Sequence, residues 1–279
     1  MHDWLETPSG RLALDWQRER LDRAVADIFG FHALQLGMPE LDGLRANRMP
    51  HRWLALDRQP RNLALPDEAA PGEADAALVP SGQRRPALAC DFTALPFPEN
   101  SLDLVLLPHA LEVASDPHAA LREVGRVLVP DGRVVICGLN PASLWGLRER
   151  RAGLYERIGF GDPYLPRRDA LIGHFRLRDW LRLLSFEVES AKFGLWQPAV
   201  RSERLLQSFK WVDKLGARWW PIFGAMYFVV AVKRVRGVRL MGRAWKESKP
   251  LAAAPVPVAN RRRAEAGSTR NEKAVSETE

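Results

Sequence analysis

A strand, a helix and a second strand follow one another over residues 102–137 of this 279-residue chain. The apolar runs 102–107 and 133–137 are the strand candidates. Asp116 precedes the helix as an N-cap, and Pro117 takes the first helical position, where proline is favoured. The helix carries apolar side chains at helical spacing, at Ala120, Val124, Val127 and Leu128. This unit indicates an α/β fold with a parallel sheet.

The same alternation of apolar runs and helical patterns extends along most of the chain. Further strands are predicted at Ala33–Gly37, Arg52–Leu56, Pro86–Cys90 and within 224–234, and residues 177–196 are typical of a helix followed by a strand. The residues 130–133, PDGR, predict a tight turn in which Gly132 supplies the positive φ. We therefore expect a doubly wound, mostly parallel sheet with helices on both faces.

Length and composition favour one large domain with attachments. We predict a domain over 1–244, with a helical lead-in at 1–30 and a core at about 31–235. Residues 141–176 break the strand and helix rhythm and predict an irregular excursion over one edge of the sheet. Residues 245–279 are alanine, proline and charge with few large apolar side chains, so we expect a disordered tail.

Charge and cysteine content narrow the class of protein. The net charge of +7 admits nucleic acid, anionic lipid or an acidic small molecule without selecting among them. Cys90 and Cys137 have no paired spacing, so neither disulfides nor a metal site is expected. The longest apolar run, 222–232, is too short to span a bilayer, and no secretory signal is present. We predict a cytoplasmic protein; no feature indicates its oligomeric state.

The run 91–136 carries an aspartate, then LPFP, an acid-containing strand, a helix with LREVGRVL and a proline-glycine turn into a further strand. This pattern resembles the middle of class I S-adenosylmethionine-dependent methyltransferases of the type 11 group. The resemblance implies a Rossmann-like sheet of seven strands in the order 3-2-1-4-5-7-6. It also implies that S-adenosylmethionine is the cofactor and that a methyl group passes to an oxygen, nitrogen or carbon acceptor.

In such a sheet the ligand lies beyond the carboxyl ends of the strands, where strand order reverses. We expect Asp57 to accept hydrogen bonds from ribose hydroxyls, because a carboxylate presents two acceptors. Asp91 is predicted to take the adenine amino group while Phe92 lies along the purine. Pro108 and His109 would border the sulfonium, with His109 as the candidate base. As alternatives, the aspartates cap helices or solvate loops, and the histidine bonds only to backbone.

The first predicted strand leads into a turn that departs from the family. The family has an acid and three glycines here; this chain has Gln35, Gly37, Pro39 and Leu41 at those positions. We still predict Gln35 and Gly37 as cofactor contacts, with Glu40 or Asp42 as replacements for the missing acid. The alternative is an inactive protein that keeps the fold as a binding module. A nicotinamide-dependent oxidoreductase is disfavoured, because no G-x-G-x-x-G follows this strand.

Residues 141–176 would emerge at the same edge and are predicted to form a lid that selects the acceptor. Their arginines and aromatics suit an acceptor with an anionic group and a ring or chain; these residues are Arg148, Arg150, Arg151, Arg167, Arg168, Trp145, Tyr155, Phe160 and Tyr164. Nucleic acid is a further candidate partner, without a supporting motif. Tryptophans near arginines, as at 211, 219 and 220, suit bases or a lipid interface, or else complete the core.

Overall fold

The computed structural model describes residues 2–58, 86–156, 164–165, 171–200 and 202–235. These residues belong to one compact unit that spans Met1–Arg236. The predicted tail, 245–279, lies outside the described residues. So do Phe160, Arg167 and Arg168 of the predicted lid.

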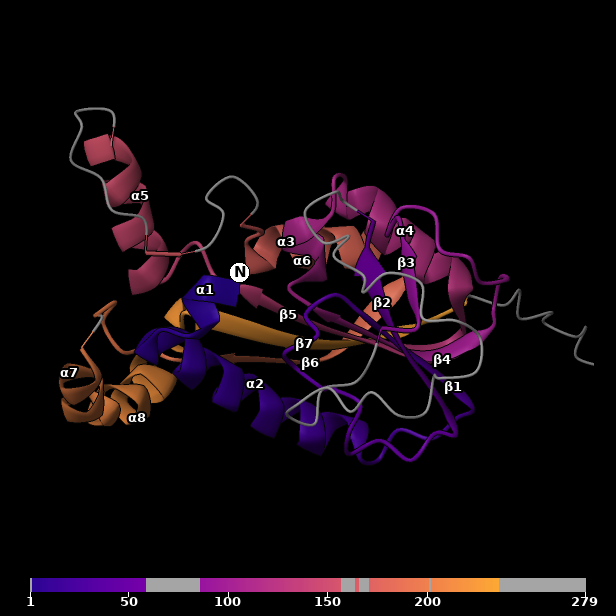
Figure 1. Cartoon of the computed structure of the whole chain (residues 1–279), viewed down its shortest axis with the longest axis horizontal. Coiled ribbons are helices and arrows are strands. Elements are labelled where there is room, and N and C mark those ends of the chain that lie inside the picture. The colour runs from indigo at the N-terminus through magenta and orange to yellow at the C-terminus, as the bar shows by residue number, and fades with distance from the viewer. Residues whose placement is uncertain (1, 59–85, 157–163, 166–170, 201, 236–279) are drawn as a thin grey trace, which may run out of the picture. The chain divides into compact units, whose positions relative to one another are not determined.

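A seven-stranded sheet forms the centre of this unit, in the order β3-β2-β1-β4-β5-β7-β6 (Figure 1). The strands are β1 (His32–Leu36), β2 (His51–Asp57), β3 (Leu88–Cys90), β4 (Leu102–Pro108), β5 (Leu128–Leu139), β6 (Phe186–Gly194) and β7 (Met226–Lys233). The first five pair in parallel, and β7 pairs antiparallel with both β5 and β6. The predicted doubly wound fold and its strand order are confirmed.

Helices flank the sheet on both sides, with α2 on one face and α3, α4 and α6 on the other (Figure 1). Their bounds are α1 (His2–Leu5), α2 (Pro8–Val25), α3 (Ala110–Val113), α4 (Pro117–Val127), α5 (Leu144–Glu156), α6 (His174–Leu183), α7 (Glu203–Ser208), α8 (Lys210–Trp219) and the 3-10 turn η1 (Pro221–Phe223). Asp116 caps α4 as predicted, since its carboxylate accepts the amides of His118 and Ala119.

Two apolar clusters fill the layers between sheet and helices, because successive strand residues point to opposite faces. On one face, Ala13, Leu21 and Val25 of α2 pack against strand residues such as Leu106 and Phe228. On the other face, the apolar stripe of α4 packs with strand residues that alternate with these, including Leu34, Val105, Ile136 and Tyr227. The buried cysteines, Cys90 and Cys137, belong to these clusters as well.

Residues 37–50, between β1 and β2, form turns and contain no helix. Two details differ from the predictions. In the turn 130–133, Asp131 has the positive φ, 62°, and not Gly132. A Cβ atom on Gly132 would lie 2.9 Å from the carbonyl oxygen of Val129, so glycine is required there by space. The stretch 141–176 is only partly irregular, because it contains the thirteen-residue helix α5.

Candidate functional site at the carboxyl edge of the sheet

The carboxyl ends of β3, β2, β1 and β4 meet at one edge of the sheet. Gly37 follows β1 at this edge. A Cβ atom on Gly37 would lie 3.8 Å from Cζ of Phe92, which follows β3, and 4.0 Å from Cα of Ala110, which follows β4. Asp57, the last residue of β2, is paired in register with Cys90, the last residue of β3. The edge thus brings the predicted cofactor residues from separate strands together.

The side chain of Gln35 holds the turn after β1 closed. Its Nε2 donates to the carbonyl oxygens of Gly37 at 3.2 Å, Met38 at 3.1 Å and Leu41 at 2.6 Å. Its Oε1 accepts from the amide of Gly43 at 2.9 Å. We call residues 37–43 the β1 turn. Gln35 is 2% exposed, so its amide is turned into this turn and away from the solvent at the edge.

This geometry explains why the family acid is replaced. Carbonyl groups from the β1 turn converge on the Gln35 side chain, and a carbonyl oxygen can only accept a hydrogen bond. An ionised carboxylate has no hydrogen to donate, so an acid here would face acceptors without a donor. An amide supplies both the donor for the carbonyls and the acceptor for Gly43.

The connection from β1 to β2, which includes the β1 turn, also buries apolar side chains. Its buried side chains, Met38, Leu41, Leu44 and Met49, join the cluster that includes α2. A Cβ atom on Gly43 would lie within 3.2 Å of Leu106, Leu21 and Gln35, so this turn lies close against both α2 and β4. The helix α2 therefore packs against residues 37–50, which form turns and contain no helix.

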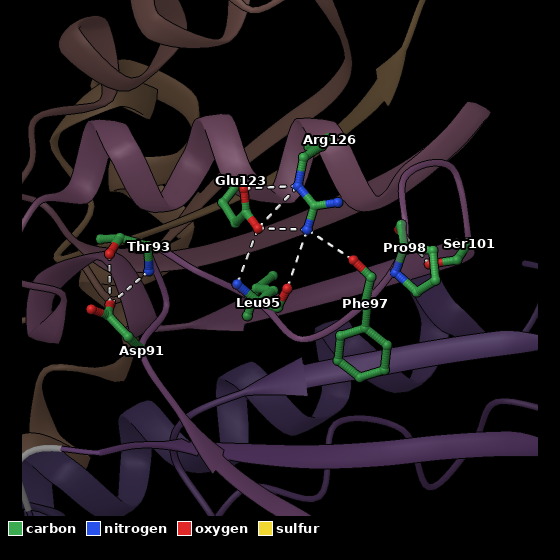
Figure 2. Close-up of polar contacts among 8 residues, drawn as sticks. All are labelled: Asp91, Thr93, Leu95, Phe97, Pro98, Ser101, Glu123 and Arg126. Carbon is green, nitrogen blue, oxygen red and sulfur yellow. Dashed lines mark hydrogen bonds and ion pairs between the residues drawn. The ribbon is translucent and has the colours of Figure 1, made fainter.

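Asp91 begins the loop after β3, which we call the β3 loop (residues 91–97). One oxygen of its carboxylate accepts both the amide and the hydroxyl of Thr93 at 2.8 Å. These hydrogen bonds hold the pKa of Asp91 below its ordinary value of 3.8. Asp91 is exposed, and its second oxygen points away from Thr93 (Figure 2). The edge thus carries an ionised carboxylate beside the half-buried Asp57.

The β3 loop is fastened to α4 by a second set of contacts (Figure 2). Arg126 donates to the carbonyls of Leu95 at 3.1 Å and Phe97 at 2.8 Å. Glu123 accepts the amide of Leu95 at 3.0 Å and pairs with Arg126 at 2.6 Å. The Arg126 guanidinium lowers the pKa of Glu123. The ion pair of Glu123 and Arg126 thus holds the β3 loop on α4.

Phe92 and Pro108 are both buried at the carboxyl edge of the sheet. Phe92 is 2% exposed and packs in the cluster of α4, beside Gly37. The Phe92 ring therefore has no open face in this structure, and its stacking along a purine stays a prediction.

His109 follows β4 with a left-handed backbone, φ 55°, and lies in a buried polar network. Its Nδ1 is 2.7 Å from Oε2 of Glu112, and its Nε2 is 3.1 Å from Nε2 of Gln17 in α2. Oε1 of Glu112 accepts the amide of Leu139, the last residue of β5. The side chain of His109 is 1% exposed. Both ring nitrogens are engaged, so a base role for His109, which also stays a prediction, has no geometric support here.

Sequence reasoning missed Gln17 and Glu112, the two partners of His109. Gln17 lies in the predicted lead-in, 92 positions from His109, so sequence spacing gave no signal. Glu112 stands three positions after His109, within reach across one helical turn. That spacing was the available clue.

Thiols and phenol near this edge are not poised for reaction. Burial raises the pKa of Cys90 to about 11, with a smaller contribution from Asp57. Burial also raises the pKa of Cys137 and that of Tyr227. Such groups remain protonated at neutral pH, so they are neither nucleophiles nor bases there. In the part of the chain that the structure describes, no cluster of His, Cys, Asp or Glu could hold a metal ion.

The predicted lid is anchored to the domain by its aromatics. Trp145 is fully buried and donates to the carbonyl of Gln197 at 2.8 Å. Tyr164 is 4% exposed, and its hydroxyl lies 2.5 Å from that of Ser9 in α2. The expectation that these two rings offer open apolar surface is wrong, because they are used to dock α5 on the N-terminal helices. Arg150 and Arg151 remain exposed.

Residues 42–136 match a family described as a methyltransferase domain. The match contains Asp57, Asp91 and the strand-helix-strand unit, and the strand order is the one expected of this family. Over residues 42–136 the chain is thus similar to a methyltransferase domain. The matched range begins inside the β1 turn, so it leaves out the positions Gln35 and Gly37, at which the turn begins.

Known proteins similar to this methyltransferase domain fall into two groups. The uncharacterized protein YafS of Escherichia coli is 29% identical over 249 residues, which is 88% of this chain and 87% of YafS. The malonyl-[acyl-carrier protein] O-methyltransferase of Halorhodospira halophila is 44% identical over 77 residues, 27% of this chain and 25% of that protein. The ubiquinone/menaquinone biosynthesis C-methyltransferase UbiE of Burkholderia orbicola is 35% identical over 78 residues, 28% and 31% of the two chains.

The chain thus spans less than a third of the named methyltransferases that it matches, and most of YafS. The matched parts of the chain are similar to methyltransferase enzymes. These comparisons give no support to the alternative of an inactive protein that keeps the fold. Among the described residues, no helix has the length and apolar character needed to cross a bilayer. The cytoplasmic location stays a prediction.

The residues at the edge fit S-adenosylmethionine unevenly. On the adenosine side, Asp57 and the ionised Asp91 offer carboxylate oxygens at the ends of β2 and β3, as the family pattern requires. On the methionine side, the β1 turn is filled from within by Gln35, Met38 and Leu41. The carboxylates expected on the adenosine side are thus present, whereas the turn expected on the methionine side differs from the family pattern.

Proposed function

We propose that the domain binds S-adenosylmethionine at this edge and catalyses transfer of its methyl group to an acceptor. The observation that supports this most directly is Asp91, an exposed and ionised carboxylate with one oxygen tied to Thr93 and the other turned outward. We assign Asp57 to the ribose hydroxyls and Asp91 to the adenine amino group, because both ligand groups are hydrogen-bond donors.

When bound, S-adenosylmethionine supplies a methyl group on positively charged sulfur, so the donor needs no activation by the protein. The residues of the edge then act by position. Asp57 and Asp91 would hold the adenosine in place. The buried side chains of Phe92 and Pro108 would exclude water on the side of the site that faces the core. Gly37, with φ 75° and no side chain, would let the backbone pass close to the methionine part. Alignment of this kind can contribute about 7 to 11 kcal/mol.

The β1 turn requires other groups for the amino end of the methionine. Glu40 and Asp42 are the acids of this turn, and each already takes part in an interaction. We propose that one of them contributes the negative charge that Gln35 lacks. We assign His109 a positioning role, because its contacts with Gln17 and Glu112 join α2 to β5 beside the edge.

The acceptor is proposed as a class only. Arg150 and Arg151 are exposed on α5, next in the chain to the carboxyl end of β5, and would suit an acceptor with an anionic group. Arg167 and Arg168, predicted for the same role, lie outside the described residues. The named relatives are an O-methyltransferase and a C-methyltransferase, so they do not decide which atom is methylated.

Calorimetric titration of the full chain with S-adenosylmethionine and with S-adenosylhomocysteine tests this proposal. We expect both to bind, and Asp91→Asn to weaken both by about tenfold, as the loss of a hydrogen bond to a charged acceptor implies. Asp179→Asn, an exposed aspartate on α6, is the matched control and should bind as the wild type does. Absence of binding by the wild type, or equal affinity in Asp91→Asn, would contradict the assignment.

A further inference from the structure

A band of large apolar side chains lies exposed on α7, α8 and η1. We call it the aromatic surface; its residues are Leu205, Trp211, Leu215, Trp219, Trp220, Ile222 and Phe223. Their exposed fractions range from 40% to 69%. Half of the fourteen exposed large apolar side chains in the described residues lie within this short stretch. A concentration of exposed apolar side chains of this kind marks an interaction site more often than scattered single residues do.

The helix below this surface is fixed in place. Asp213 of α8 accepts the amide of Trp196 and the side-chain amide of Gln197, both at 2.8 Å. Gly216, one turn later, packs against Trp196 so closely that a Cβ atom would lie 2.3 Å from its Cγ. One side of α8 is therefore docked on the segment after β6. The tryptophans on its other side are exposed although the helix is held.

The turn η1 is fixed at the carboxyl end of β5. Asn140, the residue after β5, donates to the carbonyls of Ile222 at 2.7 Å and Gly224 at 2.9 Å. Trp196 donates through Nε1 to the carbonyl of Trp220 at 2.8 Å. The backbone of η1 is tied down while the Ile222 and Phe223 side chains remain exposed, 40% and 52%. Packing against described residues thus leaves these side chains uncovered.

Positive charge borders the apolar side chains. Trp211, Leu215 and Trp219 are four residues apart and so lie on one face of α8. Lys214 and Arg218, also four apart, are exposed beside that face. Neither forms an ion pair with any other residue that the structure describes.

We propose that the aromatic surface binds an anionic membrane surface. Tryptophan and leucine on one side of a helix, with lysine and arginine next to them, are typical of helices that lie in the lipid headgroup region. Tryptophan prefers that region because its ring is apolar and its N–H is polar. Anionic headgroups attract nearby lysine and arginine. The net charge of +7 acts in the same direction.

The place of this surface links it to the methyltransferase edge. Asn140 fastens η1 to the carboxyl end of β5, and β5 neighbours β4 at the candidate site. If the proposed methyl transfer is correct, a docked domain would hold that edge beside the bilayer, within reach of an acceptor dissolved in lipid. Membrane binding itself does not depend on the proposed reaction.

Vesicle flotation of the full chain without cofactor tests the surface independently of catalysis. We expect the chain to float with phosphatidylcholine vesicles that contain phosphatidylglycerol, and more weakly with pure phosphatidylcholine. Trp211→Ser with Trp219→Ser should lower partitioning by about tenfold or more, because two large rings no longer enter the interface. Phe29→Ser with Leu183→Ser, where the side chains are 73% and 76% exposed, is the matched control and should float normally.

Charge reversal separates the electrostatic contribution to membrane binding from the contribution of the apolar side chains. Lys214→Glu with Arg218→Glu should reduce binding to the anionic vesicles by roughly tenfold or more, and the exposed pair Arg122→Glu with Arg182→Glu should have a smaller effect. Thermal melts that match the wild type would show that each variant is folded. The proposal fails if the wild type floats with neither vesicle, if the tryptophan variant floats as the wild type does, or if the surface instead joins two copies of the chain.

Discussion

Two loops at the same edge of the sheet are built in opposite ways. The β1 turn is closed on itself, with the Gln35 amide in its middle and its apolar side chains buried against α2. The β3 loop is fastened from outside by Glu123 and Arg126, which leaves Asp91 exposed at its start. A loop that is held by side chains of another element leaves its own polar groups available to a ligand. A loop that is held by its own hydrogen bonds uses those groups itself.

The difference corresponds to what each loop keeps of the family pattern. The β3 loop begins with the aspartate of the family pattern and runs into LPFP, and it lies inside the matched range, 42–136. The β1 turn has lost the acid and two glycines, and its new residues form an internally consistent packing. We infer that the methyltransferase domain has kept its adenosine contacts under a fixed loop and rebuilt the methionine contacts.

Gln35→Glu would break this comparison most strongly, although it restores the family residue. At pH 8 we expect the free energy of unfolding to fall by about 3 to 5 kcal/mol, because a buried carboxylate would face carbonyl oxygens. Burial raises the pKa of such a carboxyl in the folded state. The loss should therefore appear above the unfolded pKa of about 4.3 and shrink at lower pH. Urea denaturation at pH 8 and at pH 5 measures it.

Gln35→Met provides the control for charge in this position. It removes the hydrogen bonds without adding a carboxylate, so we expect a loss of about 1 to 3 kcal/mol with little dependence on pH. If the glutamate variant were as stable as the wild type at pH 8, the amide network would not be what holds the β1 turn.

Arg126→Met tests the loop that is held from outside. The carbonyls of Leu95 and Phe97 would lose their donor and Glu123 its partner, so we expect a stability loss of about 1 to 3 kcal/mol. Faster amide hydrogen exchange over 91–97 and weaker S-adenosylmethionine binding should accompany it. Arg122→Met, on the exposed side of the same helix, is the control. Unchanged exchange in the Arg126 variant would show that the β3 loop needs no support from α4.

Much of the sheet was predictable, because its signal is local. The alternation of apolar runs gave the strands, and Asp116 with Pro117 gave the start of α4. The carboxylate of Asp103 in β4 accepts the amides of Phe31 and His32 at the start of β1, its neighbour in the sheet. These features depend on residues close in sequence or on strand pairing that the fold class fixes.

The rest depends on contacts between distant residues, which a single sequence does not display. The role of Gln35 depends on the carbonyl groups of the β1 turn, which point toward its side chain. Residue types alone do not show where backbone carbonyl groups point. Trp145 and Tyr164 were expected on the surface, because an aromatic in a stretch rich in arginine has no visible partner. Their partners lie in α1, α2 and the residues after β6.

Thr93→Val is expected to have the smallest effect. It removes one of the hydrogen bonds that lower the pKa of Asp91, so that pKa should rise toward 3.8. Since the folded pKa is the depressed one, the stabilisation is present above 3.8 and is lost as the pH falls through the folded pKa. Asp91 is exposed, so we expect less than about 0.5 kcal/mol at neutral pH. An NMR titration of Asp91 measures the shift; an unchanged pKa would contradict the role of Thr93.

The contacts of α2 also fix an order of events during synthesis. Gln17 lies 3.7 Å from the sulfur of Met226, 209 positions later, and Ser9 bonds the carbonyl of Val200. At ribosomal rates the interval between Gln17 and Met226 is roughly 10 to 40 seconds. During that time α2 has no β7 to cover its apolar face. Strand β7 lies between β5 and β6 in the sheet, yet it is the last of the seven strands to be synthesised. The packing of α2 against the sheet can therefore be completed only after β7 has emerged.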